Sequence, residues 1–283
     1  MRPEMEKRKF ELRHIVYIVI LVICLIAIGV AVYMQFFRDA KLGLIVGITK
    51  EKEDEEIKEL KENFLNTFDN KIGIISEYKG TVNKIKNDQD IILVAYNTQE
   101  QEENYTVDFK IPYFNINTET AKQYNQQIKS IFKDKSESVL SSTSGKNIVF
   151  NVKYKAYEND NILSLIILSE LKEGESNERI IIKTYNYNME TNKMVSINDI
   201  INKKNINLQE ADNRIKSEIN SSQEQNIKLS ELGYNVTIRD TNKDEFKIEN
   251  AKEYILGQNG YLYIIYPYGN DEFTSEYDVV IIK

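Results

Sequence analysis

A run of 23 residues without a charged side chain, Ile15–Phe37, constrains the fold of this chain more than any other feature. At about 1.5 Å rise per residue, a helix of this length reaches across a bilayer hydrocarbon core of about 30 Å. Within lipid every backbone N–H and C=O needs a partner inside the segment, and a helix supplies these partners. Tyr17 and Tyr33 stand near the two ends, where amphipathic rings favour the interface. The sequence therefore predicts a single transmembrane helix over Ile15–Phe37, with the membrane as its partner.

Two other interpretations of this run are a cleaved signal peptide and a lipoprotein signal. A signal peptide has a shorter apolar region that ends at small residues, and the residues that follow here, Gln35–Asp39, offer no such site. A lipoprotein signal would end at Cys24, but the bulky Ile23 stands where processing requires a small residue. A retained helix fits the residues better than either alternative.

The flanks of the helix predict its orientation. Five basic residues lie in the first fourteen positions: Arg2, Lys7, Arg8, Lys9 and Arg13. Basic residues beside a membrane helix are retained in the cytoplasm. We expect a cytoplasmic tail over residues 1–14 and an extracytoplasmic part over residues 38–283, in a single-pass protein of the cell membrane.

The composition of the outer part argues against several classes of function. It holds 32 basic and 41 acidic residues, a net charge of −9, whereas nucleic-acid binding requires a basic face. The only cysteine, Cys24, and the only histidine, His14, lie outside it. Disulfides, cysteine or histidine metal sites and histidine-based triads are therefore excluded from this part. We predict no metal, no cofactor and no nucleic-acid partner.

The pattern of apolar residues predicts a connector followed by two α+β domains. Over residues 38–72 we expect a connector with an amphipathic helix from Thr49 to Phe68. Over residues 73–175 we expect a smaller α+β domain. Its predicted elements are strands Ile91–Tyr96 and Tyr105–Ile111, the latter ended by Pro112, a helix Asn117–Lys135, and strands Asn147–Tyr157 and Ile162–Leu171.

The second domain is expected over residues 176–283. Its predicted elements are a strand Arg179–Tyr187, a short helix capped by Ser196 over Asp199, a helix Asn207–Leu232, and strands at Tyr254–Leu256, Tyr261–Tyr266 and Tyr277–Ile282. Gln258-Asn259-Gly260 predicts a hairpin turn. Because short turns join successive strands, the fold class is α+β with a mostly antiparallel sheet and packed helices, behind one transmembrane helix.

Two segments carry a resemblance to a known family. Glu178–Ile201 reads ERIIIKTYNYNMETNKMVSINDII, and Gly260–Tyr268 reads GYLYIIYPY. Together they resemble the extracytoplasmic domain of the RsiV anti-sigma factor family, which also occurs beside the catalytic domain of some peptidoglycan deacetylases. Tyr105–Leu171 is similar to the smaller domain that usually precedes it. The resemblance implies an α+β domain of unknown general function, which in the anti-sigma member binds lysozyme.

Two departures limit what this resemblance implies. Residues 1–14 are too short for a sigma-binding segment, and the outer part has no histidine for the metal site of the deacetylases. Neither sigma-factor regulation nor deacetylation therefore follows for this chain.

Aromatic residues near the C-terminal turn are the candidate binding residues: Tyr266, Tyr268 and Phe273. The alternative is that these tyrosines pack into the core of the sheet. Nearby carboxylates could supply a pair for glycoside hydrolysis, namely Asp271, Glu272, Glu276 and Asp278, although acidic residues are abundant throughout the chain.

The function predicted from these features is a membrane-anchored extracytoplasmic binding or sensing protein of the bacterial envelope, without enzymatic activity. Its ligand is expected to be a lysozyme-like protein or a cell-wall component. One alternative is a carboxylate-dependent enzyme that acts on peptidoglycan. Another is a structural partner whose membrane helix binds other helices, with Gly29 and Ala27 or Ala31 as points of close approach.

Overall fold

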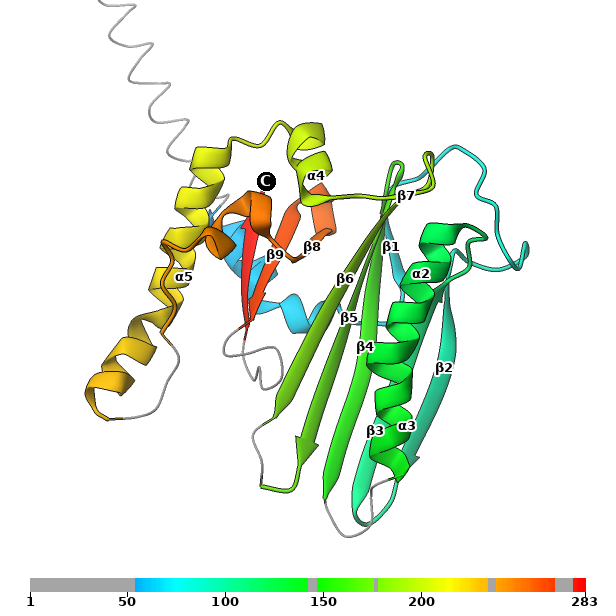
Figure 1. Cartoon of the computed structure of the whole chain (residues 1–283), viewed down its shortest axis with the longest axis horizontal. Helices are drawn as coiled ribbons and strands as arrows, with labels where there is room; N and C mark the ends of the chain where they lie inside the picture. Colours follow the sequence, from blue (N-terminus) through cyan, green and yellow to red (C-terminus); the bar gives the residue numbers. More distant parts are fainter. Residues whose placement is uncertain (1–53, 142–146, 176–177, 234–237, 268–276) are drawn as a thin grey trace, which may run out of the picture. The chain divides into compact units, whose positions relative to one another are not determined.

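The computed structural model describes residues 54–141, 147–175, 178–233, 238–267 and 277–283. The chain divides into two compact units, Met1–Leu60 and Lys61–Lys283. Residues 54–60 of the first unit are helical. The second unit is an α+β domain with mostly antiparallel strands, which confirms this part of the predicted fold class (Figure 1).

The larger of two sheets contains seven of the described strands. Six run in the order β2-β3-β4-β5-β6-β7, and β1 joins at the side of β4. Their bounds are β1 Ile72–Ser76, β2 Ile92–Gln101, β3 Tyr105–Phe114, β4 Ile148–Asn159, β5 Ile162–Glu173, β6 Arg179–Asn188 and β7 Lys193–Met194. The first eight residues of β5 are all buried, as expected of a strand that is covered on both faces. Strands β4, β5 and β6 form the antiparallel meander that their short turns predict.

Strand β4 changes its parallel neighbour halfway along its length. Its first half, Ile148–Val152, pairs with β3, and its last part, Ala156–Asn159, pairs with β1. Asn70 lies between the two neighbours: its side-chain oxygen accepts the N–H of Tyr154 at 3.0 Å, and its own N–H donates to the Tyr154 carbonyl at 2.9 Å. Asn70 adopts a φ of 60°, a left-handed conformation that asparagine tolerates better than most residues.

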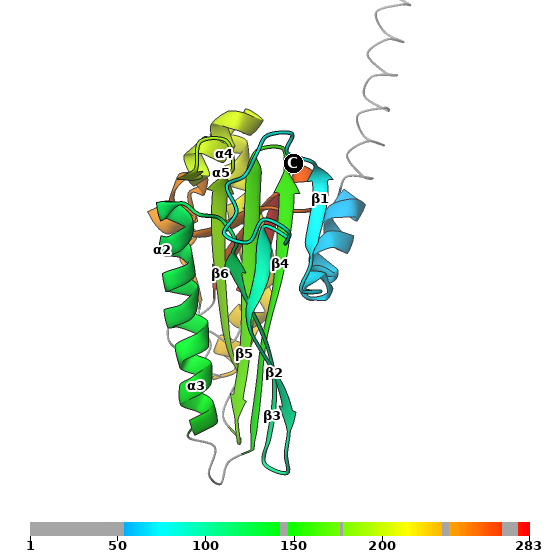
Figure 2. The same cartoon turned by 90° about the vertical axis from the view of Figure 1, so that its right-hand side faces the viewer.

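One long helical segment covers one face of the larger sheet (Figures 1 and 2). It consists of α2 Glu119–Ile128, a π-helical stretch η2 Lys129–Lys133 and α3 Asp134–Ser141. Thr118 caps it, because its side-chain oxygen accepts the N–H of Ala121. The first hydrophobic core lies between this segment and the sheet, and includes Val107, Phe109, Ile111, Phe114, Tyr124, Ile128, Phe132, Leu163, Leu165, Ile167 and Tyr187.

The smaller sheet lies on the opposite face. Its strands are β8 Glu253–Leu256, β9 Leu262–Pro267 and β10 Tyr277–Ile282, which are antiparallel in the order β10-β9-β8. Side chains of a strand alternate between its two faces. Leu163 and Leu165 of β5 therefore point toward α2, whereas Ser164 accepts the N–H of Leu256 in β8.

Two helices build a second hydrophobic core with the smaller sheet. They are α4 Ile197–Lys204 and α5 Leu208–Glu231. The predicted capping box is confirmed: Asp199 donates its N–H to the Ser196 hydroxyl, and the Asp199 carboxylate accepts the N–H of Ser196. Members of this core include Val195, Ile197, Ile200, Ile201, Ile215, Ile219, Phe246, Leu262, Ile264, Tyr266 and Val280.

Three local expectations need correction. Pro112 does not end β3, which continues to Phe114. Pro112 pairs with Val94 of the edge strand β2, next to a register irregularity, and a missing N–H is tolerated there. The helix predicted to Phe68 ends at residue 62 and is followed by a 3₁₀ turn η1, Phe64–Thr67. The turn at Gln258–Gly260 joins the antiparallel strands β8 and β9, as predicted, but as a 3₁₀ turn η5.

The predicted boundary between residues 175 and 176 falls inside one sheet. β5 and β6 lie on either side of it and pair directly. Ile162 lies opposite Asn188 at one end of the paired stretch, and Leu171 lies opposite Arg179 at the other. The first hydrophobic core likewise includes residues from both sides, such as Leu165 and Tyr187. Residues 73–175 and 176–283 are therefore not separate compact units.

Within the described residues, no helix is long and apolar enough to span a bilayer. The predicted transmembrane helix Ile15–Phe37 and the predicted tail over residues 1–14 lie outside the described residues.

Candidate ligand-binding cleft

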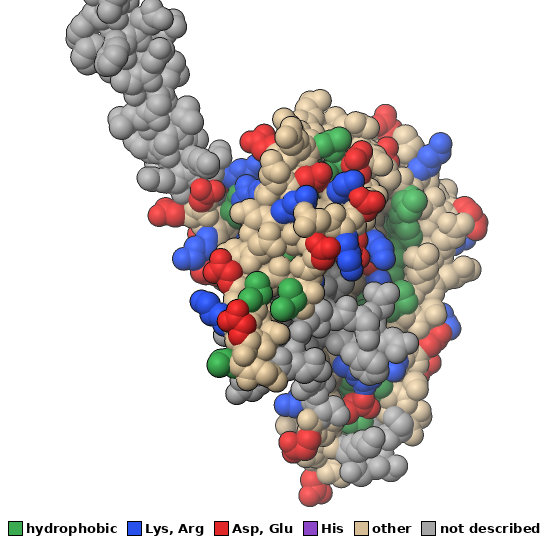
Figure 3. Space-filling model, turned by 60° about the vertical axis from the view of Figure 1, so that its left-hand side comes forward, with side chains coloured by type: hydrophobic (Ala, Val, Ile, Leu, Met, Phe, Trp, Pro, Cys, Tyr) green, Lys and Arg blue, Asp and Glu red, His purple; other side chains and the backbone are tan. Residues whose placement is uncertain are grey.

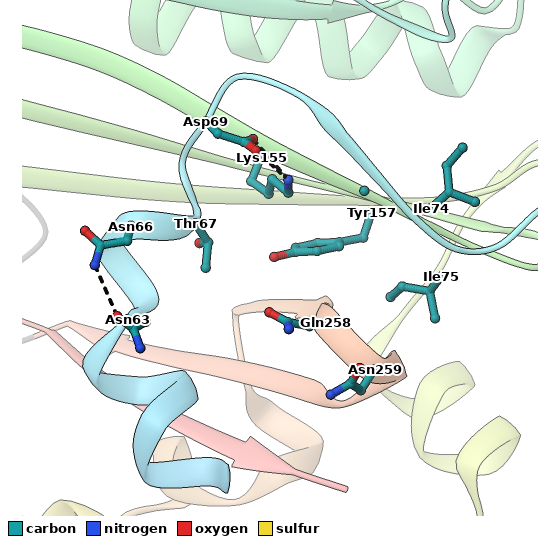
Figure 4. A pocket seen from close by; sticks show the side chains of 11 residues that line it. Asn63, Asn66, Thr67, Asp69, Ile74, Ile75, Lys155, Tyr157, Gln258 and Asn259 are labelled. Atoms are coloured by element: carbon teal, nitrogen blue, oxygen red, sulfur yellow. Dashed lines mark hydrogen bonds and ion pairs between the residues drawn. The ribbon is translucent and has the colours of Figure 1, made fainter.

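A cleft of about 640 Å³ opens where η1, β1, β4 and η5 meet (Figure 4). Four carboxamide side chains line it: Asn63 and Asn66 from the η1 segment, and Gln258 and Asn259 from η5. Asn66 donates to the side-chain oxygen of Asn63 at 3.2 Å, whereas the Gln258 carboxamide has no hydrogen-bond partner among the described residues. All four residues are exposed to solvent at the rim of the cleft.

An ion pair forms one wall of the cleft. The ammonium of Lys155 lies 3.0 and 3.1 Å from the two carboxylate oxygens of Asp69. The same ammonium lies 5.5 Å from the ring centre of Tyr157, which is a favourable cation–π distance. Among the described residues that line the cleft, only Lys155 and Asp69 are charged, so this lining has no net charge.

Tyr157 places a neutral phenol in the same wall. Burial raises the pKa of Tyr157 to about 12, with a smaller raising effect from the Asp69 charge, while the hydrogen bond with the Thr67 side chain lowers it. The ring lies close to the backbone of β1, because a Cβ atom on Gly73 would stand only 3.2 and 3.3 Å from two of its carbons. The absence of a side chain at Gly73 therefore lets β1 approach the ring.

The turn that holds Gln258 and Asn259 depends on a left-handed residue. Asn259 has a φ of 58° and is followed by Gly260 with a φ of 71°. Asparagine and glycine adopt such conformations more readily than other residues. This turn brings the two carboxamides opposite η1, which lies far earlier in the chain.

A second cleft of about 500 Å³ lies on the other face of the β1–β4 pair. Its charged lining residues are Lys71, Lys84, Asp90 and Glu158. Ile74 of β1 lines both clefts, and its side chain is 66% exposed. The first cleft is thus neutral and rich in carboxamides, whereas the second carries unlike charges.

Of the predicted binding residues only Tyr266 is described, and it lines neither cleft. Tyr266 is 6% exposed, and its ring packs against Phe246 with 5.5 Å between ring centres. Burial raises the pKa of Tyr266 above its ordinary value. The Tyr266 ring therefore belongs to the second hydrophobic core, as the alternative interpretation held, and Tyr268 and Phe273 lie outside the described residues.

The candidate carboxylates are likewise only partly described. Asp278 forms an ion pair with Arg239 and accepts a hydrogen bond from the Ser222 hydroxyl at 2.9 Å. Asp271, Glu272 and Glu276 lie outside the described residues. Among the residues that are described, no group of three or more His, Cys, Asp or Glu could hold a metal ion.

The surface charge of the domain is mixed in sign on the face drawn in Figure 3, where acidic and basic side chains of described residues are interspersed. Ion pairs between described residues include Arg214 with Glu218 and Lys247 with Asp244.

Comparisons with known proteins give distant structural neighbours. No family model and no curated protein matches the sequence. A DUF3298 family protein from Pseudomonas aeruginosa PAO1 is similar with 13% identity and a TM-score of 0.39, over 68% of this chain and 86% of that one. A DUF3298 family member from Bacteroides fragilis NCTC 9343 is similar with 11% identity and a TM-score of 0.32, over 63% of this chain and 80% of that one. DUF3298 denotes a domain of unknown function, and we draw nothing about function from these two likenesses.

Proposed function

We propose that this chain is a membrane-anchored extracytoplasmic binding protein of the bacterial envelope, and that it captures its ligand in the cleft between η1 and η5. The observation that carries the proposal is the set of four exposed carboxamides around the ion pair of Lys155 and Asp69, whose charges offset each other. Binding sites are concave and place a small number of polar groups beside apolar surface. The cleft supplies both, because Ile74 and Ile75 complete its lining.

The volume of the cleft supports a ligand rather than a single ordered water. At about 640 Å³ it falls within the range of roughly 300–1,000 Å³ that is typical of small-molecule sites. Its lining residues come from one compact unit and from four elements of that unit, so the site is largely preformed. A preformed site binds without a large ordering cost.

The membrane anchor and the topology in this proposal rest on the sequence. Ile15–Phe37 has the length and composition of a single-pass helix, and basic residues gather on its N-terminal side. Fusion of a reporter enzyme that is active only outside the cytoplasm, placed after Lys283, tests the topology. Activity of the fusion supports an extracytoplasmic domain, and an inactive but intact fusion contradicts it.

Binding is tested with the full-length chain in lipid nanodiscs. Purified cell wall and a muramidase serve as the two defined candidates, which represent the cell-wall and the lysozyme-like ligands. We expect saturable capture of one candidate, and a loss of about tenfold or more in affinity in the double variant Asn66→Ala, Gln258→Ala. The matched control is Asn97→Ala, Gln99→Ala, which removes two exposed carboxamides from β2, away from the cleft. Equal effects of the two double variants contradict the cleft as the site.

A specific observation also bears on the alternative of a peptidoglycan-acting enzyme. Asp69 supplies the only carboxylate among the described lining residues, and Lys155 holds it in an ion pair. An enzyme of that kind uses two carboxylates on either side of the scissile bond. Binding without turnover is therefore the function that the geometry of this cleft supports best.

A further inference from the structure

We infer that the cleft between η1 and η5 takes a neutral saccharide that carries N-acetyl groups. This inference rests on the proposed function and specifies the chemical class of its ligand. It follows from the charge, the hydrogen-bonding groups and the apolar residues of the lining, which are considered in turn.

The electrostatics of the cleft favour an uncharged ligand. The Lys155 side chain is 12% exposed, and its ammonium is satisfied by both oxygens of Asp69 and by the Tyr157 ring. An anionic ligand would have to compete with Asp69 for this ammonium, and a cationic ligand would have to displace Lys155 from the carboxylate. A neutral ligand leaves the pair intact, and it avoids the cost of taking the carboxylate partner away from the largely buried Lys155 side chain.

The hydrogen-bonding groups favour ligand groups that both donate and accept. A carboxamide offers an NH₂ donor and a carbonyl acceptor side by side. Asn63, Asn66, Gln258 and Asn259 provide four such groups, and the Tyr157 phenol remains protonated far above neutral pH. Hydroxyls match this dual character. An acetamido group presents one N–H and one C=O on opposite sides of its trans amide, and two different carboxamides of the lining can each meet one of them with a hydrogen bond.

The apolar residues of the cleft suit the remaining parts of such a ligand. Ile75 lies on the side of β1 that faces Gln258 and Asn259, whereas the adjacent Ile74, which is 66% exposed, points away from them (Figure 4). A pyranose ring has an apolar face of C–H groups, and an acetamido group ends in a methyl. These surfaces can cover Ile75 while the polar edge of the ring faces Gln258 and Asn66. Covering exposed apolar area in this way adds to affinity.

An extended peptide is the competing ligand class, and β1 is poorly suited to it. Peptides that add to a sheet edge need a regular run of backbone donors and acceptors. β1 has only five residues, and its register shifts between Ile74 and Ser76. The polar groups of the cleft lining are instead mostly side-chain carboxamides, which suit a saccharide better than a peptide backbone.

The experiment measures binding of defined oligomers to the full-length chain in nanodiscs by calorimetry. Three tetrasaccharides are compared: one of N-acetylglucosamine, its fully de-acetylated form, which is cationic, and one of glucose, which is neutral but has no acetamido group. A tetrapeptide of alanine represents the peptide class. We expect the N-acetylated oligomer to bind at least about tenfold more tightly than each of the other three, since loss of a matched hydrogen bond in a polar site has about this effect.

Two variants test the location. Gln258→Ala is expected to weaken binding of the N-acetylated oligomer by about tenfold, because it removes an exposed carboxamide that has no partner among the described residues. Lys71→Gln is the matched control, since Lys71 lies beside β1 but lines the second cleft, and it should leave binding unchanged.

The possible outcomes separate this inference from the proposed function. Equal binding of the acetylated and glucose oligomers, preference for the peptide, or an equal effect of Lys71→Gln overturns the N-acetylated saccharide. If no oligomer binds but cell wall or muramidase is captured in a manner that depends on Gln258, the inference fails and the proposed function stands. If the folded chain captures none of these probes, both are wrong.

Discussion

The Ser164 hydroxyl donates a hydrogen bond to the side-chain oxygen of Asn186 at 2.6 Å, between two residues that lie directly opposite each other on β5 and β6. Both side chains are buried, at 0% and 3% exposure. The pair extends to the smaller sheet, because Asn186 donates to the Tyr254 carbonyl at 2.7 Å and Leu256 donates its N–H to Ser164 at 3.2 Å. Two polar side chains of the larger sheet thus hold the backbone of β8.

Removing Asn186 from this network should destabilise the domain strongly. In Asn186→Ala, the Ser164 hydroxyl and the Tyr254 carbonyl both lose a buried partner, and we expect the free energy of unfolding to fall by about 2–4 kcal/mol. Urea unfolding of the full chain, followed by tyrosine fluorescence because the chain contains no tryptophan, measures this loss. The control Asn97→Ala on the exposed side of β2 should change stability by no more than about 0.5 kcal/mol. A loss in Asn186→Ala as small as that of the control contradicts the role of the network.

Substitution of Asn70 should lower the stability of the domain, partly because its backbone is left-handed. Asn70→Ala places a Cβ-bearing residue without a local hydrogen bond at a φ of 60° and removes the acceptor for the Tyr154 N–H, so we expect a loss of about 2–3 kcal/mol. Asn70→Gly restores the backbone freedom and should recover about half of this loss. Hydrogen exchange at the Ala156 amide, which donates to the Lys71 carbonyl at 3.1 Å, should report the loosened attachment of β1. An equal loss in the glycine and alanine variants would contradict this explanation.

Local elements of this fold follow from the sequence because short-range interactions determine them. The Ser196 capping box, the helix that begins after Asn207 and the meander of β4 to β6 depend on neighbours within a few residues or across a short turn. The parallel pairs of β4 do not. Nothing in the pattern of residues 72–76 or 105–109 indicates that each will pair with a different half of β4.

The cleft was not predictable for the same reason. Asn63 and Asn66 precede β1, whereas Gln258 and Asn259 follow β8, and only the tertiary fold brings them together. The one local signal was the turn at Asn259-Gly260, whose left-handed residues place the two carboxamides. The aromatic cluster that suggested a binding site contains Tyr266, whose position on a strand directs its ring into a core.

Replacing Gly73 and Gly257 by alanine should lower the free energy of unfolding by different amounts. A Cβ on Gly73 would lie 3.2 Å from a ring carbon of Tyr157, whereas a Cβ on Gly257 would lie 2.5 Å from a ring carbon of the buried Tyr263. Overpacking of this kind costs about 1–3 kcal/mol. We expect Gly257→Ala near the upper end of this range and Gly73→Ala near the lower end, as measured by urea unfolding. The reverse order would show that β1 is held more rigidly than β8.

Gly73→Ala should also affect the cleft. The ring of Tyr157 must move by a few tenths of an ångström to accept the methyl group, since 3.2 Å is tighter than ordinary van der Waals contact. Calorimetry should show weaker binding of the proposed saccharide in Gly73→Ala than in Gly257→Ala, although the latter is the less stable protein. If the less stable variant instead shows the larger loss of affinity, this expectation is wrong.

The capping carboxylate of Asp199 should make stability depend on pH in the acid range. Hydrogen bonds from the side chain and the backbone N–H of Ser196 hold the pKa of Asp199 below its ordinary value of 3.8. A group whose pKa is lowered on folding stabilises the protein above its unfolded pKa, and this contribution is lost as the pH falls through the folded value. Asp199→Asn should therefore be less stable than the unaltered chain by about 0.5–2 kcal/mol at neutral pH. The difference should shrink as the pH falls below about 3.8, and a constant difference would contradict the assignment.

Partly buried tyrosines should determine how the stability of the domain falls in alkali. Burial raises the pKa of Tyr277 to about 12 from an ordinary value of 10.0, with a smaller raising effect from the charge of Glu170. The protonated phenol is thus favoured in the folded state, so its contribution to stability is present below pH 10.0 and is lost as the pH rises from there toward about 12. Burial likewise raises the pKa of Tyr254 to about 12. Urea unfolding at a series of alkaline pH values should therefore show stability falling across this window.

The variant Tyr277→Phe isolates one of these phenols. Its ring can keep the edge contact with Phe64, at 5.8 Å between ring centres, while the ionisable group is gone. We expect its stability to fall less steeply with pH than that of the unaltered chain between pH 10.0 and about 12. The slope of stability against pH counts the protons that unfolding releases, so the difference in slope should approach one proton in the middle of the window. Identical slopes would show that the Tyr277 phenol ionises in the folded protein as readily as in the unfolded chain.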